Sequence, residues 1–216
     1  GPGQNEIDFR YSDPLTAADN TLTFQAVVKT VAERNGLYAD FSPKPLRHQP
    51  GNGFHINISV KGGNCEDPLS HMIAGILAHI SELTVFLNPT VASYERFGGP
   101  KAPEYISWSN QNRSQLIRVP AAVDAYRRAE LRSPDPTTNP YLAFALLIYA
   151  GLDGIQQKLP LPAPTDLNLF TASADILAGL QRLPLTLREA ATLAANSSFV
   201  SQYLPKTIVQ TYYNQR

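Results

Sequence analysis

The chain has 216 residues, of which 43% are hydrophobic and 17% are charged. This composition excludes a disordered protein and favours a soluble globular one with a sizeable core. The 18 basic and 18 acidic residues cancel to a formal net charge of zero, which argues against nucleic acid or an anionic membrane as the main partner.

The first half of the chain is predicted to mix strands and helices. Strands show alternating polar and apolar residues, and helices show apolar residues at three- and four-residue spacing. Polar residues interrupt the longest apolar stretches, so we expect no membrane-spanning helix. The expected elements are a strand at residues 6–11, a helix at 16–34, strands at 38–41 and 54–60, and a helix that begins at Asp67 or Ser70 and ends near 86.

The second half is predicted to begin with strands and to end with helices. The expected elements are strands at residues 105–109, 114–119 and 125–133, the first two paired with each other, and helices at 140–159, 173–181, 186–196 and 198–213. The order favours an α+β fold, with an antiparallel sheet and helices on one side of it. We expect residues 1–160 to form the sheet-and-helix core and 161–216 to form a helical C-terminal extension of the same domain.

Cysteine usage bears on the compartment. Cys65 is the only cysteine, so an intramolecular disulfide is excluded and a reducing, cytoplasmic location is expected. Cys65 lies in a glycine-rich turn without a pattern typical of a nucleophile, which favours an inert thiol.

The predicted strand at 54–60 has one unusual face. Successive side chains of a strand point to opposite sides, so His55, Asn57 and Ser59 share a face opposite the apolar residues. A face exposed to water usually carries Lys, Glu or Thr. The pattern alone therefore leaves two readings open, a lined site and a solvated face.

A second predicted strand places Arg128, Glu130 and Arg132 on one face, with Arg113 and Arg118 upstream. Arginines beside a carboxylate can bind phosphate or carboxylate groups through bidentate contacts. A surface ladder of ion pairs is the alternative. Taken with His55, the set suits a hard metal such as Mg²⁺ or Mn²⁺ and a phosphate-bearing ligand, which indicates phosphoryl transfer.

Five segments are distinctive as strings of residues. They read GPGQNE at 1–6, KP at 44–45 followed by GNGFHINIS at 51–59, NRSQLIRVP at 112–120, ELRSPDP and NPYLAF at 130–144, and AGLDGI at 150–155. In this order they resemble the signature segments of the glutamine synthetase family, most closely its type I members. The resemblance covers nearly the whole chain. It implies a glutamine synthetase/guanido kinase-like catalytic domain, in which a curved antiparallel sheet carries helices on one side.

The resemblance also implies metal and nucleotide ligands. Glu6 resembles a ligand of the first of two divalent metals, Mg²⁺ or Mn²⁺. His55 and Glu130 resemble ligands of the second metal, which bridges the phosphates of the co-substrate ATP. The positions implied to contact ATP are Ser59, Asn57 and Arg128.

Four arginines are implied to act in catalysis. Arg96 and Arg132 resemble residues that hold glutamate and its phosphorylated carboxyl group, and Arg113 and Arg118 resemble residues that neutralise the transferring phosphoryl group. The implied activity is that of a glutamate–ammonia ligase. Its glutamate carboxylate attacks the γ-phosphate of ATP, and ammonia then displaces phosphate from γ-glutamyl phosphate.

Two positions depart from the family pattern. The family has a flap that reads roughly YEAP, whose Glu helps to take a proton from ammonium, whereas residues 100–103 read PKAP here. A charged Lys101 repels ammonium, and Glu104 is the possible substitute. The change keeps open a γ-glutamyl–amine (polyamine) ligase of the same family, and a non-catalytic regulatory relative is a further alternative. Phe170 stands where some members adenylylate a tyrosine, so that regulation is not expected.

The resemblance implies that the chain is a C-terminal catalytic fragment. We expect it to lack the family's N-terminal β-grasp domain and the first catalytic strands, which carry further metal ligands. The fragment alone is therefore expected to be inactive. The full-length protein is expected to form a homo-oligomer of stacked rings that binds glutamate, ammonia and ATP, without nucleic acid or membrane partners.

Overall fold

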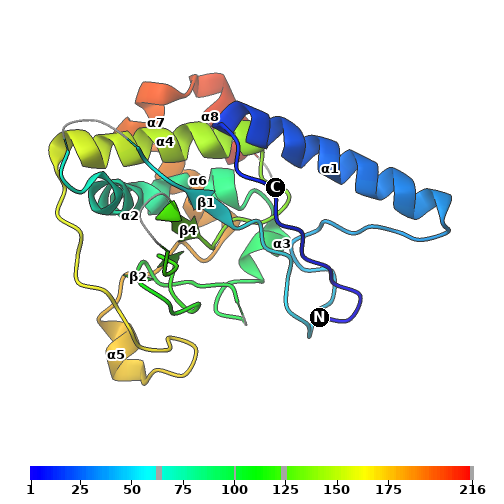
Figure 1. Cartoon of the computed structure of the whole chain (residues 1–216), viewed down its shortest axis with the longest axis horizontal. Helices are drawn as coiled ribbons and strands as arrows, with labels where there is room; N and C mark the ends of the chain where they lie inside the picture. The colour runs from blue at the N-terminus through cyan, green and yellow to red at the C-terminus, as the bar shows by residue number, and fades with distance from the viewer. Residues whose placement is uncertain (62–64, 100, 123–125, 215–216) are drawn as a thin grey trace.

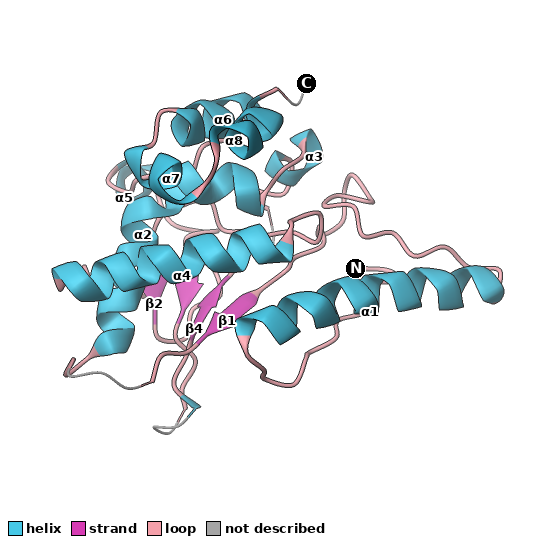
Figure 2. Ribbon diagram, turned by 90° about the horizontal axis from the view of Figure 1, so that it is seen from above, coloured by secondary structure: helices cyan, strands magenta, loops and turns pink. Residues whose placement is uncertain are grey.

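Two long helices, α2 (Pro68–Leu87) and α4 (Pro140–Gln157), pack against each other over a small sheet (Figure 1). The computed structural model describes residues 1–61, 65–99, 101–122 and 126–214. Figure 2 shows α4 running across the strands. Apolar side chains of both helices and of the sheet form one core, which includes Ile80, Leu146 and Leu131. The predicted α+β class with packed helices is confirmed.

The sheet has four short strands in the order β1-β4-β3-β2. Their bounds are β1 (Ile56–Ile58), β2 (Trp108–Ser109), β3 (Ile117–Arg118) and β4 (Ala129–Leu131). β4 pairs antiparallel with both β1 and β3, as predicted, but β2 and β3 pair in parallel. The prediction of a purely antiparallel sheet is therefore wrong. The Ser109 hydroxyl accepts from the backbone N–H of Asn112, and the Asn112 side-chain oxygen accepts from the backbone N–H of Ser114. These bonds hold the loop between β2 and β3, and this loop restores the direction of the chain.

The strands predicted at residues 6–11 and 38–41 are absent, since both segments are loops. A strand needs a neighbour that pairs with its backbone, and neither segment has a paired strand within the part of the chain described. Residues 6–11 instead rest on α1 (Pro14–Arg34) through edge-to-face contact between Phe9 and Phe24. The other predicted strands are shorter than expected, and residue 125 of the last one lies outside the described residues.

The long helices were predicted well because their ends carry local signals. Asp13 accepts hydrogen bonds from two backbone N–H groups at the start of α1, and Asp67 and Asn139 cap α2 and α4 in the same way. By length and composition α2, with a hydropathy of 1.4, could cross a membrane, contrary to our expectation. Of the most apolar 18-residue stretch of α2, 67% is buried inside the protein, so α2 serves here as the central core helix.

The tail is helical, with α5 (Ala174–Ala178), α6 (Leu187–Ala195), α7 (Ser198–Tyr203) and α8 (Lys206–Tyr213). The predicted helix at 198–213 is broken at Pro205, which has no backbone N–H to continue the ladder of hydrogen bonds. The predicted helix at 173–181 is reduced to α5. The short helix α3 (Val91–Tyr94) was missed, although Thr90 and Ser93 form a capping box that could have indicated it.

Close contact between α2 and α4 depends on glycine. A Cβ atom on Gly75 would lie 2.1 Å from the carbonyl oxygen of Ala150, and one on Gly154 would lie 2.1 Å from that of His71. These neighbours are backbone atoms, which cannot avoid the clash by a change of rotamer as a side chain can. The two helices can therefore approach this closely only without side chains at these positions.

The tail is held to the core at His79 of α2. Its Nδ1 lies 2.5 Å from Glu82 on the same helix, its Nε2 lies 2.9 Å from Asp153 of α4, and its ring stacks on Phe199 of α7 at 3.8 Å. Burial alone would lower the pKa of His79, but the two carboxylates outweigh it and the pKa is raised. A charged His79 therefore joins three helices. The proposed boundary between residues 160 and 161 stays a prediction.

Replacing Gly75 with alanine should destabilise the fold severely, because the added methyl would meet the carbonyl of Ala150. We expect the free energy of unfolding to fall by about 3 kcal/mol or more, measured by urea denaturation. Gly179→Ala is the matched control, since the nearest atom to its Cβ is 3.6 Å away. Equal stability of the two variants would contradict the close helix contact.

The His79 contact should make stability depend on pH. Because its folded pKa is raised above the ordinary value of 6.5, its contribution is complete below that value and is lost as the pH rises through the folded pKa. His79→Gln should therefore lower the melting temperature more at about pH 6 than at about pH 9. The exposed His48 offers the control, His48→Gln. The same loss at both pH values would argue against a charged clamp.

Candidate active site

The side chain of Glu130 lies where three strands meet. His55, directly before β1, places Nδ1 3.3 Å from one carboxylate oxygen of Glu130, and Arg132, directly after β4, places Nη1 2.6 Å from the same oxygen. Arg118 of β3 donates from Nε to the other oxygen at 2.5 Å. Glu130 is paired in register with Asn57 of β1 and with Arg118. We call these four groups, Glu130, His55, Arg118 and Arg132, the Glu130 cluster.

The Glu130 cluster compensates a buried charge, since the Glu130 side chain is only 7% exposed. Burial by itself would raise its pKa. The hydrogen bond from His55, together with the charges and hydrogen bonds of Arg132 and Arg118, outweighs burial and lowers the pKa to about 2. Glu130 is therefore ionised at neutral pH, in the state that a metal ligand requires.

The remaining residues predicted on these strands lie close by. Arg128 donates from Nε to the side-chain oxygen of Asn57 at 3.0 Å, which joins two of the predicted nucleotide contacts across β1 and β4. Arg132 donates from Nε to the carbonyl of Arg113 at 3.2 Å. Burial lowers the pKa of Arg132, and the charges of Arg118 and Arg113 lower it further, against the opposing effect of Glu130. The charges of Arg113 and Arg118 therefore lie close enough to Arg132 to act on it.

Ser59, the third predicted nucleotide contact, lines a pocket of about 120 Å³ beyond the end of β1. The pocket walls also include Lys61, Asp67 and Arg127. Ser59 thus borders a pocket beside Arg127, the neighbour of Arg128 in the chain.

Arg96 reaches the same region from the segment after α3. Its guanidinium is 2% exposed and donates to the carbonyl oxygens of Ser133 at 3.0 Å and Pro134 at 3.4 Å. A Cβ on Gly53 would lie 2.8 Å from Nε2 of His55 and 3.5 Å from Nη2 of Arg96. Gly53 therefore leaves the space in which Arg96 and the Glu130 cluster come together.

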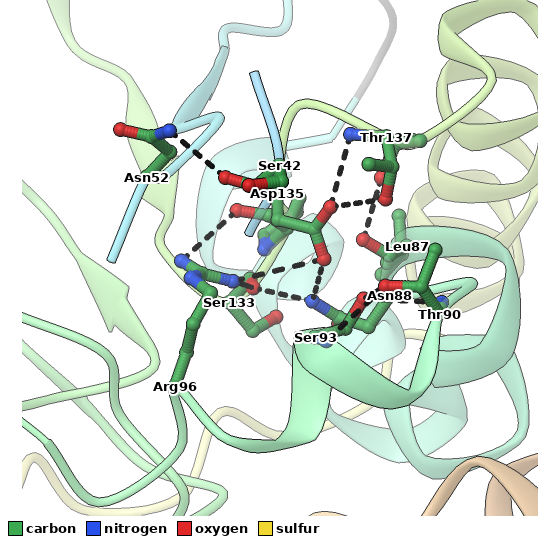
Figure 3. Close-up of polar contacts among 12 residues, drawn as sticks. Ser42, Asn52, Leu87, Asn88, Thr90, Ser93, Arg96, Ser133, Asp135 and Thr137 are labelled. Carbon is green, nitrogen blue, oxygen red and sulfur yellow. Dashed lines mark hydrogen bonds and ion pairs between the residues drawn. The ribbon is translucent and has the colours of Figure 1, made fainter. Parts of the chain in front are cut away.

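A buried carboxylate that sequence reasoning missed supports Arg96. Asp135, with an exposure of 0%, lies 3.9 Å from Arg96 and accepts hydrogen bonds from Asn88 and from the backbone and side chain of Thr137. Figure 3 shows these groups facing one another between the ends of three segments. The resemblance marks the ELRSPDP string at 130–136 as a signature segment but assigns no role to Asp135, although an acidic residue between two prolines is a signal of a fixed polar site.

Glu6 is not part of the Glu130 cluster. It is exposed on the N-terminal loop, and no hydrogen bond or ion pair links it to that cluster in the described part of the chain. The loop is held instead by Gln4, whose side chain donates to the carbonyl of Gly51 and to Asn52. Within the described residues, no group of three or more His, Cys, Asp or Glu side chains is placed to hold a metal ion. His55 and Glu130 are thus two converging potential ligands, and a metal ion bound there would need further ligands.

The loop that replaces the family flap is tied to the tail. Gly98 and Lys101 have positive φ angles, and Gly98 donates to the carbonyl of Ala102. Residue 100 lies outside the described residues. Glu104, the possible substitute for the flap Glu, forms an ion pair with Arg182 at 3.0 Å. The carboxylate of Glu104 is therefore already engaged by a residue of the tail.

A protein-family description of the catalytic domain of glutamine synthetase matches residues 1–216. The chain is 45% identical to a glutamine synthetase of Methanosarcina mazei over 98% of its own length and 51% of that protein. It is 43% identical to the enzyme of Clostridium saccharobutylicum over 97% and 51%, and 40% identical to that of Staphylococcus aureus over 100% and 52%. The chain spans about half the length of the curated relatives it matches.

Two solved structures share the fold. The one described as "GmaS/ADP complex-Conformation 1" superimposes with a TM-score of 0.83 at 31% identity, over 95% of this chain and 50% of that one. The one described as "Apo GmaS without ligand" gives a TM-score of 0.82 at 31% identity, over 94% and 50%. These relatives support both the fold and the order of its elements.

The Glu130 cluster should give the protein a distinct acid transition. Since the folded pKa of about 2 lies below the ordinary value of 4.5, the stabilisation is complete above 4.5 and is lost as the pH falls towards 2. Glu130→Gln should lower the urea midpoint at neutral pH and flatten its fall over this window, because it cannot ionise. Glu33→Gln, on the exposed side of α1, should keep the original slope. Identical slopes in both variants would show that Glu130 is not held as an ion.

Proposed function

Because this chain belongs to the glutamine synthetase family, we propose that it is the C-terminal catalytic part of a ligase that joins ammonia to glutamate at the expense of ATP. The Glu130 cluster is the observation that carries the proposal. It combines an ionised carboxylate with an imidazole and two guanidinium groups, each within 3.3 Å of that carboxylate. Neither core packing nor solvation requires such a set.

His55 and Glu130 fit a hard divalent cation, because the carboxylate is ionised and both donors converge from adjacent strands. When bound, Mg²⁺ or Mn²⁺ would neutralise charge on the ATP phosphates. The remaining ligands of this ion would come from the half of the protein that this chain does not cover, and Glu6 would serve the other metal.

The arginines supply the electrostatic part of catalysis. Arg118 and Arg113 would neutralise the phosphoryl group as the side-chain carboxylate of glutamate attacks the γ-phosphate of ATP. Arg132 and Arg96 would hold glutamate and the resulting γ-glutamyl phosphate, from which ammonia displaces phosphate. Fixed guanidinium groups stabilise the charge that develops in such a transfer without reorganisation of solvent.

Nucleotide binding is proposed for the adjoining surface. Arg128 is oriented by Asn57 at 3.0 Å, and Ser59 lines the neighbouring pocket with Lys61 and Arg127. These basic and hydroxyl groups suit the phosphates and ribose of ATP. The similarity to a structure described as an ADP complex supports this proposal.

A γ-glutamyl–amine ligase, for a polyamine in place of ammonia, is the second candidate. Lys101 in the flap loop and the engagement of Glu104 by Arg182 favour it, because neither residue is then available to accept a proton from ammonium. A non-catalytic regulatory relative is a third possibility. The retained Glu130 cluster argues against it.

The properties of the whole protein follow from the same proposal. We propose a cytoplasmic enzyme that assembles as stacked rings, with nucleic acid and membranes having no part in its function. Regulation by adenylylation is not expected, since Phe170 is exposed on its loop but carries no hydroxyl group.

The 216-residue chain alone should show no metal-dependent ATP cleavage with glutamate, because residues 1–61, 65–99, 101–122 and 126–214 bring too few metal ligands together. The full-length protein should cleave ATP, and Glu130→Gln in it should lower kcat by about a hundredfold or more through loss of a ligand. Glu33→Gln should leave kcat unchanged. Phosphate release with Mg²⁺ or Mn²⁺ is the measurement. Ordinary turnover by the isolated chain would contradict the first expectation. A full-length protein that releases no phosphate would favour the hypothesis of a non-catalytic regulatory relative.

Product analysis of the full-length protein separates the two ligases. Mass spectrometry of reactions with ammonium, putrescine or spermidine should show glutamine as the main product. A γ-glutamyl–polyamine product at a higher kcat/KM would instead assign the second function.

A further inference from the structure

We propose that Asp135 is a positioning residue that fixes the guanidinium of Arg96 so that its Nε–H stays free for a carboxylate ligand. The inference rests on the proposed function and names a further residue of the same site. Arg96 is 2% exposed and Asp135 is 0% exposed, so both charges are withdrawn from water. A buried guanidinium without a counter-charge is strongly destabilising.

Asp135 is held rigidly enough to orient a partner. One of its carboxylate oxygens accepts from the backbone N–H of Thr137 at 2.9 Å and from the hydroxyl of the same residue at 2.5 Å. The other accepts from Asn88 at 3.1 Å. Figure 3 shows the carboxylate between these donors and Arg96. At 3.9 Å the Asp135–Arg96 contact is a charge interaction rather than a hydrogen bond, so Asp135 does not use up the donors of Arg96.

The donors of Arg96 divide into used and free groups. Both Nη atoms donate to the carbonyls of Ser133 and Pro134, which lie between β4 and Asp135. The Nε–H is buried and has no hydrogen-bond partner in the described part of the chain. An unpaired buried donor carries a free-energy cost unless a ligand satisfies it. A carboxylate approaching the Nε edge would do so.

The turn at Ser133 and Pro134 connects Arg96 to the rest of the site through hydrogen bonds. The carbonyl of Pro134 also accepts from the backbone N–H of Phe54 at 2.8 Å, and Phe54 directly precedes His55. Arg96 and the Glu130 cluster thus share one anchored turn. Without the charge of Asp135, the guanidinium should turn toward solvent and leave this turn.

The first test uses the 216-residue chain and does not depend on activity. Phenylglyoxal labels accessible arginines, and peptide mass spectrometry reports the rate at each position. Arg96 should be protected in the wild-type chain and should label about tenfold faster or more in Asp135→Asn, while the exposed Arg188 labels equally in both. Thr137→Val removes one hydrogen bond but keeps the charge, so Arg96 should stay protected. Protection of Arg96 in Asp135→Asn would overturn the proposal.

The second test uses the full-length protein. Asp135→Asn should raise KM for glutamate about tenfold or more and leave KM for ATP within about twofold, a split that simple loss of stability does not produce. Glu33→Gln, on the exposed surface of α1, should change neither constant. Equal changes in both KM values would overturn the positioning role. Lack of any activity in the wild-type protein would refute the proposed function, while the labelling result would still decide the role of Asp135.

A double-mutant comparison covers the case in which Asp135→Asn folds poorly. If Asp135 acts through Arg96, then Asp135→Asn in an Arg96→Gln background should lower the melting temperature much less than it does alone. The same loss in both backgrounds would show that Asp135 supports the fold independently of Arg96.

Discussion

The carboxylate of Glu130 sets the constraint on which the site depends. A buried carboxylate must be matched by nearby donors and positive charge, and here the match comes from three strands at once. β1, β3 and β4 must therefore keep their register for His55, Arg118 and Arg132 to converge. The charge compensation thus ties the register of the short sheet to the site.

The same rule operates on the second buried pair. Arg96 and Asp135 are withdrawn from water at a turn that follows β4, and Gly53 leaves room for Arg96 beside His55. The two charge clusters share the turn at Pro134. Fixed, mutually supported charges fit the proposed transfer of a phosphoryl group. Such charges stabilise the developing charge without reorganisation of the surrounding groups during the reaction.

The helical tail contacts the core at two places. Arg182 pairs with Glu104 behind the loop that replaces the family flap, and the neighbouring backbone forms a bridge between Tyr105 and Arg182. His79 holds α7 to the core on the other side of α2. The tail is thus anchored to the core at both places.

The sequence by itself determined the long helices, the α+β class and the identity of the residues in the Glu130 cluster, since these depend on neighbours in the chain and on recognisable segments. Only the tertiary structure decided the parallel pairing of β2 with β3, the absence of a strand around Glu6, and the pairing of Asp135 with Arg96. Those features depend on which distant groups share a buried, low-dielectric space. Local periodicity carries no information about that choice, because it is made by hydrogen-bond and charge balance across the whole fold.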